Sequence, residues 1–264
     1  MNAIDRALCL SLLAFLGACG SGSEAAPAPE KERSAPLEER SIPDPSLLVQ
    51  AEEALLGGDF EAVERLLEPV VSAEFPTGRA ELLFALAHHK RKRYPAAEPW
   101  FEAAAAAPGE WNGVESVPYY LGWCCYYLGD LEGARTSFVE HRELNPEEGD
   151  TVFALGVIDL DLGEPERAAE RFEEAIGLHR AALAQGKQHL VPDLAKSWAR
   201  LGDARSAVGD LPGARTALER CVQLYPPFHV AWFRLGSVLR ELGEEQAAQA
   251  AFAEHERWSA ADSQ

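Results

Sequence analysis

The chain has 264 residues and carries 43 Asp and Glu against 24 Lys and Arg, which gives a formal net charge of −19 at pH 7. This charge argues against nucleic acid and anionic lipid headgroups as general partners, because both are themselves strongly negative. The five cysteines show no spacing typical of a disulfide framework, and we expect Cys124, Cys125 and Cys221 to be buried free thiols.

Residues 1–18 have the pattern of a secretion signal. Arg6 lies in a short polar start, residues 7–16 are nearly all apolar, and small residues precede Cys19. The apolar run is too short to span a bilayer. An ordinary cleaved signal is one interpretation of this pattern.

A second interpretation rests on Leu16-Gly17-Ala18-Cys19, which resembles the lipobox of bacterial lipoproteins. The resemblance implies that Cys19 becomes the mature N-terminus and carries several acyl chains, which suffice for stable membrane attachment. It also implies that the chain is lipid-anchored to a membrane of the bacterial cell envelope and faces the periplasm or the cell surface. Residues 20–43 have almost no large apolar side chains, so we expect residues 19–43 to be a lipidated Cys and a disordered linker.

The rest of the chain is organised by four Leu-Gly pairs, whose sequence numbers differ by 34, 46 and 34 from one pair to the next. Each Gly of a pair is followed after seven residues by a second Gly, after five more by an Ala, and after four more by a large apolar residue. The pairs are Leu121-Gly122, Leu155-Gly156, Leu201-Gly202 and Leu235-Gly236, and the last column is Phe138, Phe172, Leu218 and Phe252.

Each copy of this register predicts two helices joined by a tight turn. In the copy at 117–146, apolar residues recur at helical spacing up to Gly129, where the conformational freedom of glycine permits a helix to end. The second helix buries Ala134 and Phe138 and ends before Pro146, whose ring cannot continue a helix. No single pair of helices can bury its apolar face alone, so the copies must stack.

A self-similarity with a period of about 34 residues and with these columns resembles the tetratricopeptide repeat (TPR) family. The resemblance implies an all-α fold over residues 44–264, a right-handed superhelix (α-solenoid) of about six helix-turn-helix units. The first unit begins at Asp44-Pro45, and both opening units are less regular than the others. The predicted units cover about 45–76, 79–108, 115–147, 149–178, 192–226 and 229–259.

The one longer interval, between Gly156 and Gly202, holds 12 extra residues around 178–190. We expect both flanking helices to be longer, each by roughly 9 Å. His179 and His189 lie in this stretch, but no Cys or carboxylate accompanies them at a metal-ligand spacing. We therefore predict surface histidines there.

Superposing the repeats predicts which residues of the first helices face the concave groove of such a superhelix. In the third unit they are aromatic: Tyr119, Tyr120, Trp123, Tyr126 and Tyr127. In other units they are cationic or titratable: Arg79, His89, Lys90, Lys196, Arg200, Arg234 and Arg240. Aromatic and cationic side chains together suit an acidic or carboxylate-ended peptide. Alternatively, some of the rings pack against neighbouring helices, and the charges are solvated.

Lys196 and Arg200 resemble two members of the carboxylate clamp of co-chaperone TPR domains. The rest of that clamp is absent, because Tyr119, Trp123 and Ala154 stand where the family pattern has Lys and Asn. The resemblance therefore implies groove-lining cations without a complete clamp.

A run of six cationic or titratable residues, 88–93, stands at the end of a predicted helix. Cations at a helix C-terminus complement the helix dipole. The alternative is a docking patch for an acidic partner or for phosphate-bearing lipid near the anchor.

The sequence contains no phosphate loop, nucleophile elbow, HExxH, paired CxxC or CxxCH motif, so we expect no catalytic residue, metal site or cofactor. We predict a membrane-anchored scaffold, not an enzyme, that binds a protein or peptide in its groove and supports assembly of an envelope complex. Similar six-repeat lipoproteins act as pilotins for pilus secretins or serve outer-membrane barrel assembly. Two alternatives are self-association into a homo-oligomer through an apolar edge of the C-terminal unit, and binding of a small ligand or metal.

Overall fold

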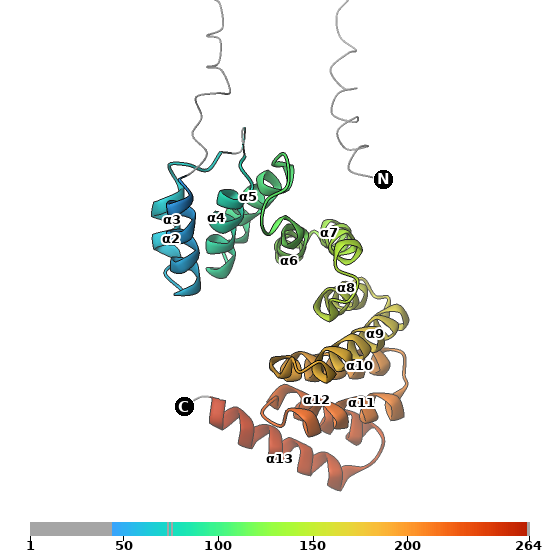
Figure 1. Ribbon diagram of the computed structural model, residues 1–264. Helices are drawn as coiled ribbons and strands as arrows, with labels where there is room; N and C mark the ends of the chain where they lie inside the picture. The colour runs from blue at the N-terminus through green and yellow to red at the C-terminus, as the bar shows by residue number, and fades with distance from the viewer. Residues whose placement is uncertain (1–43, 73, 75, 263–264) are drawn as a thin grey trace, which may run out of the picture. The chain divides into compact units, whose positions relative to one another are not determined.

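The computed structural model describes residues 44–72, 74 and 76–262, and the predicted signal, Cys19 and most of the linker lie outside these residues. By its internal contacts the chain divides into Met1–Ser41 and Ile42–Gln264, and the described residues all belong to the second unit. Within them the chain forms twelve α-helices and no strand (Figure 1). None of the described helices has the length and apolar character that crossing a membrane requires.

The helices follow one another as six pairs, each made of a helix, a short turn and a second helix. The pairs are α2 (Pro45–Leu56) with α3 (Phe60–Leu67), α4 (Arg79–Lys90) with α5 (Tyr94–Ala106), α6 (Val117–Tyr127) with α7 (Leu131–Leu144), α8 (Gly149–Asp161) with α9 (Pro165–Ala184), α10 (Val191–Ala207) with α11 (Leu211–Leu224), and α12 (His229–Glu241) with α13 (Glu245–Asp262). Short 3-10 helices, η2 (Val114–Ser116) and η3 (Gln188–Leu190), precede α6 and α10.

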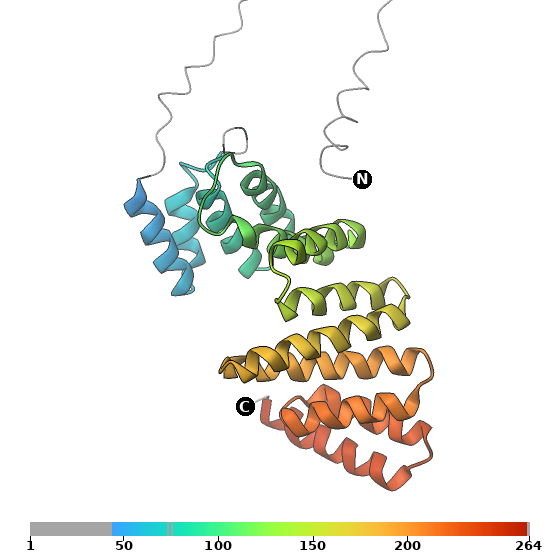
Figure 2. The same cartoon turned by 45° about the vertical axis from the view of Figure 1, so that its right-hand side comes forward.

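Consecutive helices pack against each other along the whole series, and Figures 1 and 2 show them stacked in chain order. First helices of several successive pairs also touch, as α2 touches α4 and α8 touches α10. The core is shared between pairs: one apolar cluster joins Leu67 of α3 to Leu83 of α4. This is the packing of a solenoid, in which each pair depends on its neighbours.

The Leu-Gly register has a direct cause in the packing of the two helices within a pair. A Cβ atom at Gly122 would lie 2.9 Å from ring atoms of Phe138, and a Cβ at Gly156 would lie 2.7 Å from Phe172. The glycine thus provides the space that the large residue of the second helix fills. The apolar column of the sequence is buried accordingly, with Phe138 and Phe172 both 0% exposed.

The turn inside each pair uses a residue in the left-handed backbone region. Gly129 has φ +83°, and Asp130, which follows it, accepts a hydrogen bond from the Gly133 amide at 2.9 Å and so caps α7. In the second pair the same register position is occupied by Lys92, whose φ is 57°. Among the described residues, Lys92 is the one non-glycine residue with positive φ.

The two helices around the extra residues are longer than their counterparts, as the sequence predicts. Helix α9 has 20 residues and α10 has 17, against 14 in α7 and 13 in α8. In Figure 2 the joint end of this yellow and orange pair reaches beyond the helices on either side. The unit end predicted at residue 178 lies inside α9, which continues to Ala184.

The prediction that His179 is a surface residue was wrong. Its side chain is 2% exposed, because Gly149 leaves space for the ring and polar groups of two neighbouring helices lie within hydrogen-bond distance of both nitrogens. Its Nδ1 lies 3.2 Å from the Ser197 hydroxyl, and its Nε2 lies 3.1 Å from the Asp150 carboxylate. His189 is exposed.

Candidate functional site

The first helices of the third, fourth and fifth pairs surround one cavity. It has a volume of about 130 Å³ and lies between α6, α8 and α10. Its walls are Tyr119, Trp123, Asp150, Phe153, Asp193 and Lys196. Three of these, Tyr119, Trp123 and Lys196, are residues that the sequence places in the groove. We refer to the surface around this cavity, formed by the first helices, as the groove.

A row of stacked aromatic rings continues from the cavity toward the second pair. The ring of Trp123 stacks on Tyr127 with centroids 5.9 Å apart, and Tyr127 stacks on Tyr94 at 4.4 Å. Tyr127 remains 53% exposed, so the row is accessible to solvent at this residue. Large rigid rings that are partly exposed offer contact area at a low entropic cost.

The neighbouring tyrosine, Tyr126, ties the third pair to the fourth. Its hydroxyl donates a hydrogen bond of 2.7 Å to the Asp161 carboxylate. Burial, and then this bond to a carboxylate, raise the pKa of Tyr126 to about 12, while Arg200 opposes the shift. The phenol is therefore neutral at physiological pH and acts as a donor.

The cations at the groove positions of the last two pairs are engaged by aspartates. Lys196 lies 2.9 Å from Asp193. Arg200 and Arg234 both bind the same oxygen of Asp203, at 3.3 and 2.8 Å. Burial raises the pKa of Asp203 despite the two arginines, and burial lowers the pKa of Arg234. The group formed by Arg200, Arg234 and Asp203 therefore has two guanidinium groups for one carboxylate.

Two residues predicted to line the groove lie instead between the helices. The ring of His89 contacts those of Tyr94, Phe101 and Tyr120, and both of its nitrogens are buried without a hydrogen-bond partner. Burial, and then Lys90, lower the pKa of His89 to about 4. Tyr120 stacks on Phe101 in the same apolar cluster. These two rings therefore take part in the packing between helices and do not line the groove.

Models of the tetratricopeptide repeat match residues 48–110, 195–238 and 229–259. The chain carries tetratricopeptide repeats. The matched stretches fall on the first two and the last two helix pairs, and the two middle pairs continue the same register. No curated protein matches the sequence.

Solved structures resemble this TPR array in fold. MamA from Desulfovibrio magneticus RS-1 is 17% identical with a TM-score of 0.58, over 70% of this chain and 96% of that chain. PilF of Pseudomonas aeruginosa is 17% identical with a TM-score of 0.59, over 81% and 96% of the two chains. YrrB, described as a TPR protein with an unusual peptide-binding site, is 15% identical with a TM-score of 0.52, over 69% and 86%.

The remaining predicted groove residues are distributed over the outer TPR units. Arg79 binds Glu52 of the first unit at 2.7 Å and donates to the Asn112 carbonyl. The guanidinium of Arg240 lies over the Phe252 ring, 5.7 Å from its centroid. Lys90 is exposed at the end of α4. These residues do not border the cavity between α6, α8 and α10.

The cationic run at 88–93 contributes to packing between the first two TPR units. Arg91 and Arg93 bind the Glu64 carboxylate at 3.2 and 3.0 Å, and His88 lies 3.7 Å from it. Burial is the main cause that lowers the pKa of His88. Three of the six residues of the run therefore contact Glu64 of α3. Lys90 and Lys92 are its exposed cations.

Sequence reasoning missed the acidic and apolar residues of the cavity, Asp150, Phe153 and Asp193, and the partner of Tyr126, Asp161. The TPR register could have found two of them. Phe153 stands one repeat period after Tyr119, and Asp161 stands one repeat period after Tyr127. At these two positions the fourth unit carries an aromatic residue and an acidic residue, respectively.

Asp150, His179 and Ser197 are linked by hydrogen bonds in the order found in hydrolase triads. Ser197 is 0% exposed, however, and its hydroxyl also bonds to the Asp193 carbonyl at 3.0 Å. A nucleophile must reach its substrate, so this arrangement holds α8, α9 and α10 together and does not form a reactive site. Within the described ranges, no three His, Cys, Asp or Glu side chains converge as metal ligands.

The outer face of the last TPR unit is less apolar than the sequence predicts. Its exposed residues in the first half of α13 are small or polar: Gln246, Ala247, Gln249 and Ala250. In the described chain, the exposed large hydrophobic residues of this unit, Val230 and Phe233, belong to α12. Self-association through α13 would therefore bury chiefly alanine side chains.

Proposed function

We propose that this protein is a membrane-anchored TPR scaffold that binds a peptide segment of a protein partner in its groove and supports assembly of a complex in the bacterial envelope. The observation that carries the peptide-binding part of the proposal is the cavity between α6, α8 and α10, where Trp123, Tyr119 and Phe153 stand beside charged side chains. Aromatic anchors with neighbouring polar groups are the usual centres of binding energy in protein interfaces. YrrB, which shares the fold, is described as having a peptide-binding site.

The partner segment is acidic or ends in a carboxylate. Arg200 and Arg234 share one carboxylate, Asp203, so a second carboxylate has two guanidinium groups to bind. The exposed part of Tyr127 and the cavity at Phe153 then accept apolar side chains of the same segment. Lys196 already has Asp193 as a partner and contributes less to this preference.

The groove is tested by direct titration with partners that the full-length protein captures from an envelope extract. Peptides from each captured partner are titrated against wild type, Trp123→Ala, Phe153→Ala and Arg200→Ala. Loss of an anchor at the centre of an interface costs at least about 2 kcal/mol, or roughly thirtyfold in Kd. Arg65→Ala is the matched control, because Arg65 is exposed on α3 away from the cavity. Equal Kd values for all five proteins would refute the groove assignment.

The anchor is tested separately. Cys19 is proposed to carry the acyl chains, and Cys9 lies in the same N-terminal segment but before the cleavage site. In cells grown with a labelled fatty acid, wild type and Cys9→Ser should incorporate label, and Cys19→Ser should not. Labelling of Cys19→Ser would show that the lipobox assignment is wrong.

A further inference from the structure

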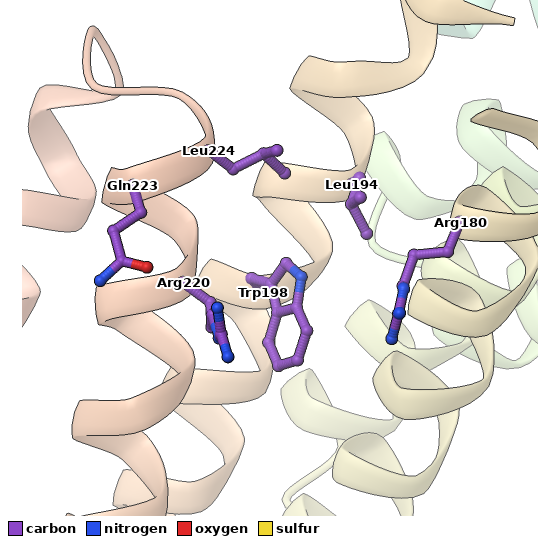
Figure 3. A pocket seen from close by; sticks show the side chains of 6 residues that line it. All are labelled: Arg180, Leu194, Trp198, Arg220, Gln223 and Leu224. Carbon is purple, nitrogen blue, oxygen red and sulfur yellow. The ribbon is translucent and has the colours of Figure 1, made fainter. Parts of the chain in front are cut away.

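A second, larger cavity lies on the other side of the helix layer. Its volume is about 450 Å³, and it is open to solvent. Its walls are Arg180 of α9, Leu194 and Trp198 of α10, and Arg220, Gln223 and Leu224 of α11. Figure 3 shows Trp198 between the two arginines, with Leu194 and Leu224 at one end of the cavity.

This cavity is separate from the groove. At 100° per residue, Leu194 and Trp198 point to the side of α10 opposite to Lys196 and Arg200. Trp198 packs against the apolar clusters of both flanking units, so the floor of the cavity is fixed by the core. A ligand here does not compete with one in the groove.

The charge of this cavity is unusual for so acidic a chain. Its lining contains two arginines and no carboxylate. Carboxylates line three other cavities of the described chain: Asp150 and Asp193 in the groove, Glu147 and Glu148 beside α9, and Glu244 and Glu245 at α13. Among the residues that the structure describes, no carboxylate pairs with Arg180 or Arg220, although most other arginines have such a partner.

The extra residues of the chain build one wall of the cavity. The second helix α7 has 14 residues, and the first 14 residues of α9 end at Leu178, so Arg180 stands in the added turns. In the repeats of ordinary length the second helix has already ended at this register position, which Pro146 and Pro226 occupy. The extension of α9 therefore adds Arg180 to the cavity, across from Arg220.

We propose that this cavity binds the C-terminal residue of a polypeptide whose last side chain is apolar. The carboxylate lies between Arg180 and Arg220, and the side chain packs on Trp198, Leu194 and Leu224. Guanidinium pairs match the planar geometry of a carboxylate. The volume falls in the range of sites that hold a small ligand or a few residues.

A chain terminus fits better than a free small acid. The Gln223 amide both donates and accepts hydrogen bonds, which matches a peptide group preceding the terminal residue. The cavity opens between the second helices α9 and α11, so the preceding chain can leave along the surface.

The test is calorimetric titration of the full chain with the peptide Gly-Ser-Gly-Ser-Phe. The probes are this peptide with a free C-terminus, the same peptide amidated, and N-acetylphenylalanine. We expect the free peptide to bind about tenfold or more tightly than the amide, because a charge-assisted hydrogen bond is worth at least that factor. Arg180→Gln and Arg220→Gln should each weaken binding by about tenfold, and Arg65→Gln should leave it unchanged.

Three results would overturn the assignment. Equal affinity for the free and amidated peptides would show that no carboxylate is recognised. Equal affinity for N-acetylphenylalanine and the free peptide would show a site for small acids. Loss of binding in Trp123→Ala with no loss in Arg180→Gln would place the peptide in the groove. Unchanged binding in Trp123→Ala, together with loss in Arg180→Gln, supports the proposal whether or not the groove has a ligand of its own.

Discussion

Gly122 lies directly against the ring of Phe138, so that a Cβ atom at Gly122 would be 2.9 Å from three ring atoms. Gly122→Ala should therefore lower the free energy of unfolding, by about 1–3 kcal/mol, because the ring must move within a filled core. The loss occurs although alanine is the better helix former. Urea unfolding followed by circular dichroism measures it.

Gly177 provides the matched control for this substitution. It lies inside α9, is exposed, and has no heavy atom within 4 Å of an added Cβ. Gly177→Ala should raise the free energy of unfolding by about 0.5–1 kcal/mol through helix propensity alone. The same sign for both variants would contradict the packing role of the glycine in the Leu-Gly register.

Lys92 adopts a left-handed conformation at a register position where the later TPR units have glycine. Lys92→Gly should therefore stabilise the protein by about 0.5–1 kcal/mol, because the steric cost of this conformation exceeds the entropic cost of glycine. Lys90→Gly, two residues earlier at the end of α4, should destabilise it. Thermal unfolding of the two variants beside wild type distinguishes backbone strain from loss of charge, since both remove one lysine.

The fold was predictable from the sequence because its constraints repeat. The contact between Gly122 and Phe138 recurs between Gly156 and Phe172, between Gly202 and Leu218, and between Gly236 and Phe252, so one physical requirement appears four times. Lys92 shows the limit of that logic. The turn of the second unit keeps its left-handed conformation with a lysine in place of glycine. The unit therefore lacks the turn glycine of the sequence register although its backbone has the same structure.

His89 titrates in a way that links stability to pH. Burial lowers its pKa in the folded protein to about 4 from 6.5. Between these values the unfolded chain binds a proton that the folded chain does not, so the stabilisation is complete above about pH 6.5 and is lost as the pH falls. We expect the stability of wild type to fall more steeply between pH 6.5 and 4 than that of His89→Phe, by at most about 1.4 kcal/mol per pH unit. Parallel curves for the two proteins would contradict this.

The candidate site was less predictable than the fold because the register gives a position but not a partner. It placed Trp123 and His89 on the same surface, yet one borders the cavity and the other is enclosed by Tyr94, Phe101 and Tyr120. It also could not show that Asp203 serves two arginines from different units. Such contacts depend on the distance between neighbouring pairs, which one repeat does not encode.

The shared carboxylate leads to a prediction about both stability and binding. Asp203→Asn leaves Arg200 and Arg234 close together without an anion, so the free energy of unfolding should fall by about 1–3 kcal/mol. Added salt should recover part of the loss, because it screens the repulsion between the guanidinium groups.

Asp161→Asn is the control for this variant. It also removes a carboxylate near the groove, but the hydrogen-bond partner of Asp161 is the neutral Tyr126 hydroxyl, so salt should restore less of its stability. The same Asp203→Asn protein should bind a carboxylate-ended groove peptide more tightly than wild type, since the peptide no longer competes with Asp203. Weaker binding by Asp203→Asn, measured where the variant is fully folded, would show that the arginines only hold α10 against α12.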